Sequence, residues 1–235
     1  MNLEHAFFIP AQNIFEEKFV LNKSESMHAI RVLRLKKYEK LFLFDGLGTG
    51  YEAVINNILQ GKVEGTIISK LKDYGENKFS INLGLGLIKR YRFENLIEKC
   101  TELGVDSFYP LLLEHNIKKT INIDRCEKII VASSKQCHRS RFPVIFKPKE
   151  LKSLFSSVKM KFIAASMEAK KSLSDLKFKE QQPLMLLIGP EGDFSSKEIE
   201  VFKENKVELF NLGTRRLRSE TAAIKAVSVL NYKFS

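Results

Sequence analysis

Apolar and polar positions in the first 72 residues follow the short, alternating pattern of β-strands. They predict strands at residues 6–9, 40–45, 51–56 and 62–70. Between the first two of these strands, residues 24–35 carry apolar side chains at helical spacing, with Ser24 or Ser26 as the expected N-cap. Short strands with one helix favour a small β-barrel domain over residues 1–72.

The pattern changes period beyond a polar linker at residues 72–78. Strands are then predicted at 79–88, 105–113, 161–165, 184–188 and 207–212, and helices at 91–103, 124–137, 198–205 and 220–232. Alternation of this kind is typical of an α/β domain, here residues 73–235, in which helices cover both faces of a parallel sheet. Ligands of such sheets bind beyond the carboxyl ends of the strands, so the loops there are the first place to look for chemistry.

Two glycine-containing loops follow strands of this predicted sheet. The first, residues 187–195, reads Leu-Ile-Gly-Pro-Glu-Gly-Asp-Phe-Ser, and its Ser195 forms a capping-box pattern with Glu198. The second, residues 211–223, contains one glycine and three arginines before Ser219, a candidate N-cap. Each loop alone is also compatible with a plain tight turn, and Glu220 with helix capping. Two such loops on successive strands are able to wall a single pocket.

Several common chemistries find no support in the sequence. Neither loop has the glycine spacing of a dinucleotide-binding or phosphate-binding loop, which argues against NAD and ATP as cofactors. The four histidines lack metal-binding spacing, and the nucleophile motif G-x-S-x-G of α/β-hydrolases is missing. We therefore expect no metal site. Of the histidines, only His138 is kept as a candidate, because it lies in a basic segment of the chain.

Charge draws attention to that segment. The chain has 235 residues, 39 of them basic and 28 acidic, for a net charge of +11. Residues 115–150 hold 9 lysines and arginines against 3 acidic residues. This window is either a polyanion-facing patch, because neutralised phosphates give sequence-independent affinity for nucleic acid, or a solvated lysine-rich surface. Charge alone leaves both open.

The remaining composition indicates a cytoplasmic protein. Its three cysteines, Cys100, Cys126 and Cys137, form no CxxC pair, so reduced thiols are expected. The longest apolar runs, such as residues 183–188, fall far short of the roughly 20 residues that a membrane helix needs. The first 18 residues lack the basic start of a secretory signal.

Several motifs stand in one order along the chain. They are Lys99–Val105 with Pro110, Lys135–Arg139 with Pro143, Gly189–Gly192 with Phe194 and Ser195, and Leu212-Gly213 continuing to Leu217–Ala222. In this arrangement the chain resembles the RsmE family, the 16S ribosomal RNA (uracil-N3)-methyltransferases of the SPOUT superfamily. His28–Arg34 and Asp45-Gly46 are similar to the small N-terminal domain of that family, so the resemblance covers nearly the whole chain.

The resemblance implies a PUA-like N-terminal barrel and a SPOUT methyltransferase domain whose C-terminal segment forms a trefoil knot. It also implies S-adenosylmethionine as cofactor, a homodimer, and 16S rRNA or the assembled small ribosomal subunit as partner. Carried over by motif, the expected cofactor contacts are Leu187, Gly189, Glu191, Gly192, Leu212, Gly213, Leu217, Arg218, Thr221 and Ala222.

Two positions depart from the family pattern. Asp193 replaces the usual second glycine of the first loop, which puts a carboxylate beside the expected cofactor and removes a residue that tolerates positive φ. Ser219 replaces a threonine, a change that keeps a capping hydroxyl.

Methylation at N3 of uracil requires loss of the N3 proton, because the protonated nitrogen is a poor nucleophile. Arg139 and Arg218 are the candidates to stabilise the resulting anion, and Glu220 is the candidate proton acceptor. The expected contacts to the RNA backbone are Arg31, Arg34, Lys118, Lys119, Arg125, Lys128 and Arg141. The alternatives are methylation of another RNA such as tRNA, or a non-catalytic RNA-binding module.

Overall fold

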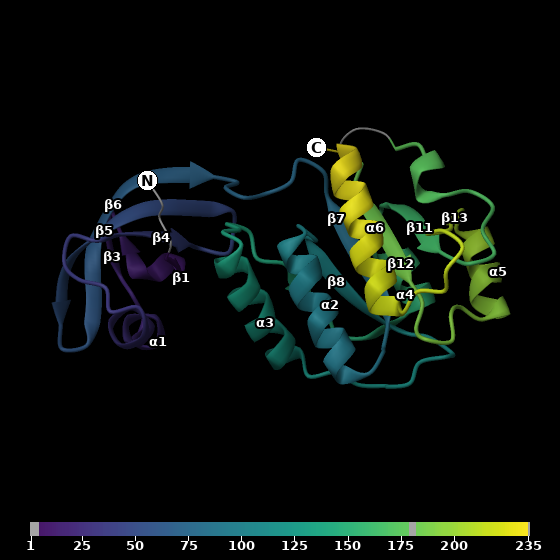
Figure 1. Ribbon diagram of the computed structural model, residues 1–235, viewed down its shortest axis with the longest axis horizontal. Coiled ribbons are helices and arrows are strands. Elements are labelled where there is room, and N and C mark those ends of the chain that lie inside the picture. The colour runs from purple at the N-terminus through teal and green to yellow at the C-terminus, as the bar shows by residue number, and fades with distance from the viewer. Residues whose placement is uncertain (1–4, 179–181, 235) are drawn as a thin grey trace. The chain divides into compact units, whose positions relative to one another are not determined.

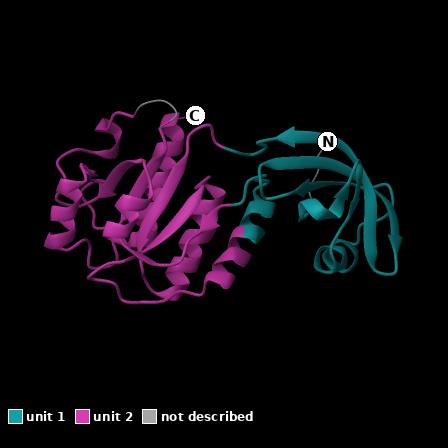
Figure 2. Cartoon of the chain, turned by 180° about the vertical axis from the view of Figure 1, so that it is seen from behind, with its two compact units in different colours: residues 1–76, 131–142 teal, residues 77–130, 143–235 magenta. Residues whose placement is uncertain are grey.

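The chain divides into two compact units. The structure, a computed structural model, describes residues 5–178 and 182–234, so part of the segment considered for a secretory signal lies outside the described residues. The first unit comprises Met1–Glu76 and Val131–Phe142, and the second comprises Asn77–Ile130 and Pro143–Ser235 (Figure 2). The boundary predicted after residue 72 therefore moves to residue 76, and a second segment joins the first unit.

Backbone hydrogen bonds explain why residues 131–142 belong to the first unit. The Ser140 N–H donates to the carbonyl of Tyr74 at 3.0 Å, and the Gly48 N–H donates to the carbonyl of Ser140 at 3.1 Å. The Phe142 N–H donates to Gly46 at 3.0 Å. Sequence periodicity does not report such pairings, since they join segments far apart in the chain.

The first unit is built on a six-stranded sheet. Its strands are β1 (Ala6–Phe8), β2 (Ile14–Phe15), β3 (Lys18–Val20), β4 (Lys40–Phe44), β5 (Thr49–Leu59) and β6 (Lys62–Lys72), in the order β1-β4-β5-β6-β3-β2. The β1–β4 pair is parallel and the other pairs are antiparallel. Buried side chains that include Phe7, Phe19, Leu41 and Ile55 form its core. Closure of these strands into a barrel stays a prediction.

The predicted helix at residues 24–35 is shorter and less regular than its pattern indicated. The short turn η1 (Ala11–Asn13) precedes it, then α1 (Lys23–Met27) is followed by a π-helical turn, η2 (His28–Val32). Both predicted caps are wrong, because the side chain of Asn22 accepts the hydrogen bond from the Glu25 N–H at 2.9 Å. Ser26 is buried instead, and its hydroxyl donates to the carbonyl of Leu21.

The second unit contains the predicted parallel sheet, which is thereby confirmed. Its strands are β7 (Ile81–Gly86), β8 (Ser107–Leu112), β9 (Val144–Ile145), β10 (Lys149–Glu150), β11 (Lys161–Ala165), β12 (Leu184–Ile188) and β13 (Glu208–Phe210). Every pair in this sheet is parallel, and the strand order is β10-β8-β7-β12-β11-β13, with β9 also paired to β8.

Helices cover both faces of this sheet. The helices of this unit are α2 (Arg90–Glu102), α4 (Leu151–Ser157), α5 (Ser196–Glu204) and α6 (Ser219–Phe234), with a short turn η3 (Leu173–Asp175). Helix α3 (Ile123–Gln136) begins in this unit and ends in residues of the first. On one face, Leu154 of α4 and Phe202 of α5 join a core cluster with Met185 and Leu187 of β12. Helices α2 and α6 pack side by side over the other face (Figure 1). The β12 residues that alternate with Met185 and Leu187 are expected to point toward that face, because successive strand residues point to opposite faces.

One feature of the strand order positions the loops of interest. Strands β12 and β13 follow each other along the chain, yet β11 lies between them in the sheet and pairs with both. Because all three strands are parallel, their carboxyl ends lie next to one another at the same edge. The two glycine loops therefore flank a third loop, the one that follows β11.

Within the described ranges, no helix is long and apolar enough to cross a membrane. None of the three cysteines forms a disulfide in the described part of the chain, and Cys100 and Cys126 are buried. Burial raises the pKa of the Cys126 thiol to about 11, which keeps it protonated at neutral pH.

Candidate active site

A cavity of about 650 Å³ lies beyond the carboxyl ends of β11, β12 and β13. Six of the predicted cofactor contacts line it: Gly189, Glu191, Leu212, Leu217, Arg218 and Ala222. The two glycine loops thus wall a single cavity, as expected from their positions after parallel strands. Residues from 189 to 222 meet here because the sheet brings their strand ends together.

Four predicted cofactor contacts lie elsewhere. Leu187 is fully buried within β12, and a Cβ built on Gly84 of the neighbouring strand would come within 2.6 Å of it. Gly192 packs against His115, whose Cβ lies 2.8 Å from where a Cβ of residue 192 would be. Gly213 turns the second loop with a φ of 104°, and Thr221 is exposed on α6. These residues shape or support the loops rather than line the cavity.

The loop after β11 completes the cavity wall. Ser166, Met167 and Glu168 line the cavity together with Ala165 at the end of the strand. Sequence reasoning missed this loop, which contains no glycine. The available signal was the rule that strand ends carry sites, but the place of β11 between β12 and β13 was needed to apply it.

The first glycine loop is held from both sides. Ser195 caps α5 as predicted: its hydroxyl accepts from the Glu198 N–H at 3.3 Å, and Glu198 accepts from the Ser195 N–H at 2.8 Å, which confirms the capping box. His115 Nδ1 donates to the carbonyls of Gly192 and Asp193, each at 3.0 Å. The imidazole must carry hydrogen on Nδ1 to make these bonds.

Asp193 occupies the position that lacks the usual glycine. Its φ is 61°, so the loop keeps the left-handed backbone that a glycine would favour. Aspartate tolerates this conformation better than most residues, and its Oδ1 accepts from the Phe194 N–H at 2.8 Å. Burial in the cavity wall raises the pKa of the Asp193 carboxyl, and the nearby charge of Glu168 adds to the effect.

The second glycine loop carries the arginines. Arg215, Arg216 and Arg218 are exposed and line the cavity, and Arg216 donates to the Glu191 carbonyl at 3.4 Å. Lys225 of α6 fixes the start of the loop by donating to the Leu212 carbonyl at 2.7 Å. Helix α6 begins at Ser219 itself, so the residue predicted as its cap is its first helical residue.

Arg92, which the sequence did not single out, connects the two glycine loops. Its Nη1 lies 3.2 Å from Glu191 Oε1 of the first loop, and its Nε lies 3.6 Å from Glu220 Oε1 at the start of α6. Arg92 comes from α2, outside both loops. Of the three predicted catalytic residues, Arg218 therefore lines the cavity, whereas Glu220 does not line it and is linked by Arg92 to Glu191, which does.

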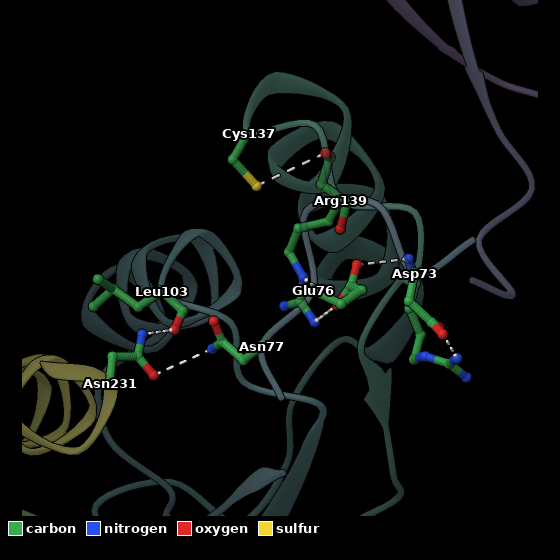
Figure 3. A network of polar contacts seen from close by, with 9 residues as sticks. Asp73, Glu76, Asn77, Leu103, Cys137, Arg139 and Asn231 are labelled. Atoms are coloured by element: carbon green, nitrogen blue, oxygen red, sulfur yellow. Dashed lines mark hydrogen bonds and ion pairs between the residues drawn. The ribbon is translucent and has the colours of Figure 1, made fainter. Parts of the chain in front are cut away.

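Arg139, the third predicted catalytic residue, belongs to the first unit and is only 2% exposed. Its Nη2 and Nε donate to Glu76 Oε2 at 2.8 and 3.2 Å (Figure 3). We therefore expect Arg139→Ala to destabilise the fold, because the substitution would leave a buried carboxylate unpaired. His138 is likewise built into this unit, where its ring packs against Phe42 and Phe44.

The predicted RNA contacts lie at the surface. The exposed residues are Arg31, Arg34, Lys118, Lys119, Arg125, Lys128 and Arg141. Two of them already have acidic partners, since Arg125 Nε lies 2.6 Å from Glu94 and Arg141 Nη2 lies 2.7 Å from Asp73. Lys118 also lines a second cavity of about 690 Å³ at the starts of α2 and α3. That cavity contains none of the predicted cofactor contacts.

In the part of the chain that the structure describes, no group of three His, Cys, Asp or Glu side chains is arranged to hold a metal ion.

Comparison with known proteins identifies the family of this chain. Residues 75–231 match the model of the RNA methyltransferase domain family. A ribosomal RNA small subunit methyltransferase E from Buchnera aphidicola (subspecies Schizaphis graminum) is 32% identical over 91% of this chain and 90% of its own length. The chain belongs to the RsmE family. An RsmE relative from Bacillus subtilis is 24% identical over 92% of this chain and 90% of its own length.

Solved RsmE-like structures share the fold. The RsmE protein of Neisseria gonorrhoeae, crystallised with S-adenosylmethionine, has a TM-score of 0.89 at 22% identity, covering 98% of both chains. A methyltransferase of Legionella pneumophila, also solved with this cofactor, has a TM-score of 0.85 at 29% identity, covering 97% of both chains. The fold of this RsmE chain is therefore that of its structural relatives.

Proposed function

We propose that this protein transfers a methyl group from S-adenosylmethionine to N3 of a uridine in the decoding region of 16S rRNA. The observation that carries the proposal is the cavity at the carboxyl ends of β11, β12 and β13, where the two glycine loops meet. The family supports RNA as the substrate class.

The cavity fits the cofactor in size and chemistry. About 650 Å³ is within the usual range of roughly 300–1,000 Å³ for small-molecule sites. Ile188, Leu212 and Leu217 provide apolar walls for an adenosine group, and Gly189 lets the ligand approach bare backbone. Glu191 adds a carboxylate for hydroxyl or ammonium donors. When bound here, S-adenosylmethionine supplies the methyl group.

The residues of the chain then act on the nucleobase. Arg218 on the cavity wall stabilises the negative charge that spreads over uracil O2 and O4 once the N3 proton leaves. Glu220, which shares Arg92 with Glu191 as an ion-pair partner, accepts that proton. Because N3 lies on the Watson–Crick edge, the uridine must enter unpaired or flipped out of its helix. Arg139 has no part in this proposal, since its guanidinium is committed to Glu76.

The wider assembly follows from the same family membership. In our proposal the chain is a cytoplasmic homodimer, its N-terminal strands form a PUA-like barrel, and the segment through α6 forms a trefoil knot. The exposed basic residues, Lys118, Lys119 and Lys128 among them, hold the phosphate backbone of the RNA without reading bases.

The decisive experiment is mass mapping of 16S rRNA from cells with and without the gene. A uridine that carries an N3 methyl group only in the presence of the gene is the expected result. An unchanged 16S rRNA with a methyl group missing from tRNA would favour the alternative substrate. Calorimetric titration that detects no binding of S-adenosylmethionine would favour a non-catalytic RNA-binding protein.

The basic surface has its own test. Replacing Lys118 and Lys119 with alanine should weaken RNA binding and reduce the slope of log affinity against log salt by about 1–2. Each phosphate contact that forms releases counterions from the RNA, so a variant with fewer contacts releases fewer of them. Filter binding between 50 and 200 mM salt (about the range in which such slopes are measured) gives this number. An identical slope in the variant would exclude these lysines from the RNA contact.

A further inference from the structure

A single arginine lies between two carboxylates from the two glycine loops. Arg92 pairs with Glu191 at 3.2 Å and with Glu220 at 3.6 Å. All three side chains are largely withdrawn from solvent, with 24%, 22% and 13% of their surfaces exposed. At this level of burial an unpaired charge is costly, so the three groups depend on one another.

Each glutamate uses only half of its carboxylate in this link. Oε1 of both glutamates faces Arg92, whereas Oε2 of both is buried without a hydrogen-bond partner among the described residues. A buried carboxylate oxygen without a donor loses its hydrogen bonds to water and gains none in the protein. The resulting desolvation penalty is larger for a charged group than for a neutral one. Two such oxygens in one cluster, one of them on a residue that lines the cavity, indicate a missing donor.

We propose that Arg92 is a positioning residue for the cofactor loops. It ties the first loop to the start of α6 and turns a free oxygen of Glu191 toward donors of the bound ligand. The cluster carries two negative charges and one positive charge, so its net charge favours a cationic ligand that has hydrogen-bond donors. This inference rests on the proposed function, in which S-adenosylmethionine, a cation with ammonium and hydroxyl donors, occupies the cavity.

The place of Arg92 on α2 suits this role. Phe93 and Leu96 of the same helix are buried in the core, which fixes the helix against the sheet. Arg90, two residues before Arg92, offers a matched control. Its side chain is 73% exposed and pairs with Glu94, which keeps Arg125 as a second partner if Arg90 is lost.

The test is calorimetric titration of the full chain with S-adenosylmethionine. We expect Arg92→Gln to weaken binding about tenfold or more, Arg92→Lys to recover part of the loss, and Arg90→Gln to stay within about twofold of the parent. A lysine recovers only part because its ammonium is a point charge without the planar fork that faces both carboxylates. Circular dichroism confirms that each variant is folded.

A double substitution separates positioning from simple structural support. With Arg92 gone, Glu191 and Glu220 repel each other, and Glu220→Gln removes that repulsion. The affinity loss of Arg92→Gln combined with Glu220→Gln should therefore be at least threefold smaller than the product of the two single losses. General destabilisation would not produce such a coupling, because each folded variant would then lose cofactor affinity independently of the other substitution.

Two results would overturn the proposal: a parent-like affinity in Arg92→Gln, or single effects that simply multiply in the double variant. Neither result would touch the proposed methyl transfer, since titration uses no RNA. If no methylated uridine were found, the proposed reaction would be refuted, but the role of Arg92 in cofactor binding would still be tested by the measured affinities. A parent chain that binds no S-adenosylmethionine would overturn both.

Discussion

Two arginine–carboxylate clusters, one in each unit, differ in how completely their polar atoms are paired. In the first unit, Arg139 donates twice to Glu76 Oε2, and Glu76 Oε1 accepts from the Arg141 N–H at 2.8 Å, so both oxygens of the carboxylate are used. In the second unit, Arg92 meets one oxygen of Glu191 and one of Glu220, and the other two oxygens have no partner among the described residues.

This difference separates a structural cluster from a binding cluster. A buried ion pair with every acceptor used has nothing left to offer a ligand, and its loss is felt as instability. A cluster with unused buried acceptors is costly in isolation, and a ligand that brings donors relieves the cost. By this criterion Arg139 contributes to folding, whereas Arg92 contributes to the site.

Breaking the saturated cluster should give the largest effect. Arg139→Ala removes the guanidinium and leaves Glu76, whose side chain is 7% exposed, as an unpaired buried charge. We expect a loss of about 3–5 kcal/mol in the free energy of unfolding, measured by urea denaturation of the full chain.

Arg141→Ala is the control for that loss, since it removes an ion pair with Asp73 in which both side chains are about half exposed. It should cost about 0–1 kcal/mol. Equal losses in the two variants would contradict a structural role specific to Arg139.

A substitution that crowds the first glycine loop should have an intermediate effect, a loss of cofactor affinity that a comparable substitution in the first unit does not cause. A Cβ on residue 86 would lie 2.7 Å from Pro190 Cδ and 2.8 Å from Pro190 N, so Gly86→Ala must displace the loop backbone. We expect affinity for S-adenosylmethionine to fall about tenfold, or about 1.4 kcal/mol. Gly50→Ala in the first unit crowds the ring of Phe44 at 3.0 Å and should leave that affinity unchanged. Equal affinities for the two variants would exclude this loop from the binding site.

The smallest effect is expected from the charge of Asp193. Burial raises the pKa of this carboxyl above its ordinary value of 3.8, so the folded protein favours the protonated form. The corresponding stability is present below that ordinary value and is lost as pH rises through the raised pKa. Asn keeps an oxygen for the Phe194 N–H and carries no charge. Asp193→Asn should therefore gain stability over the parent progressively as pH rises above 3.8, as measured by thermal melts at a series of pH values. A difference that does not depend on pH would refute the assignment.

Local patterns in the sequence were sufficient for much of the fold. The parallel α/β unit, the apolar face of α2 and the Ser195–Glu198 capping box follow from residues at most a few positions apart, and the structure contains all three. Strands β2, β9 and β10 have two residues each, which is too short for any periodic signal.

The candidate site was predictable only in part, for a reason of distance along the chain. Both glycine loops were found from their own residues, but the loop after β11 required the strand order. The roles of Arg92 and Arg139 depend on partners far away in sequence, Glu191 and Glu76. Arg139 is a plausible catalytic residue in the sequence because its pairing with Glu76 is not visible there.

The pairing of β12 with β7 has a consequence for how this protein folds. Ile81 lies beside Leu184, so the centre of the sheet is closed by contacts between segments separated by most of the second unit. Long-range pairing of this kind is slow, because the chain loses the entropy of a large loop before the contact forms. During synthesis β7 and β8 emerge well before β12. We therefore expect the cavity to assemble late in folding, so that the recovery of cofactor binding during refolding would report when the sheet closes.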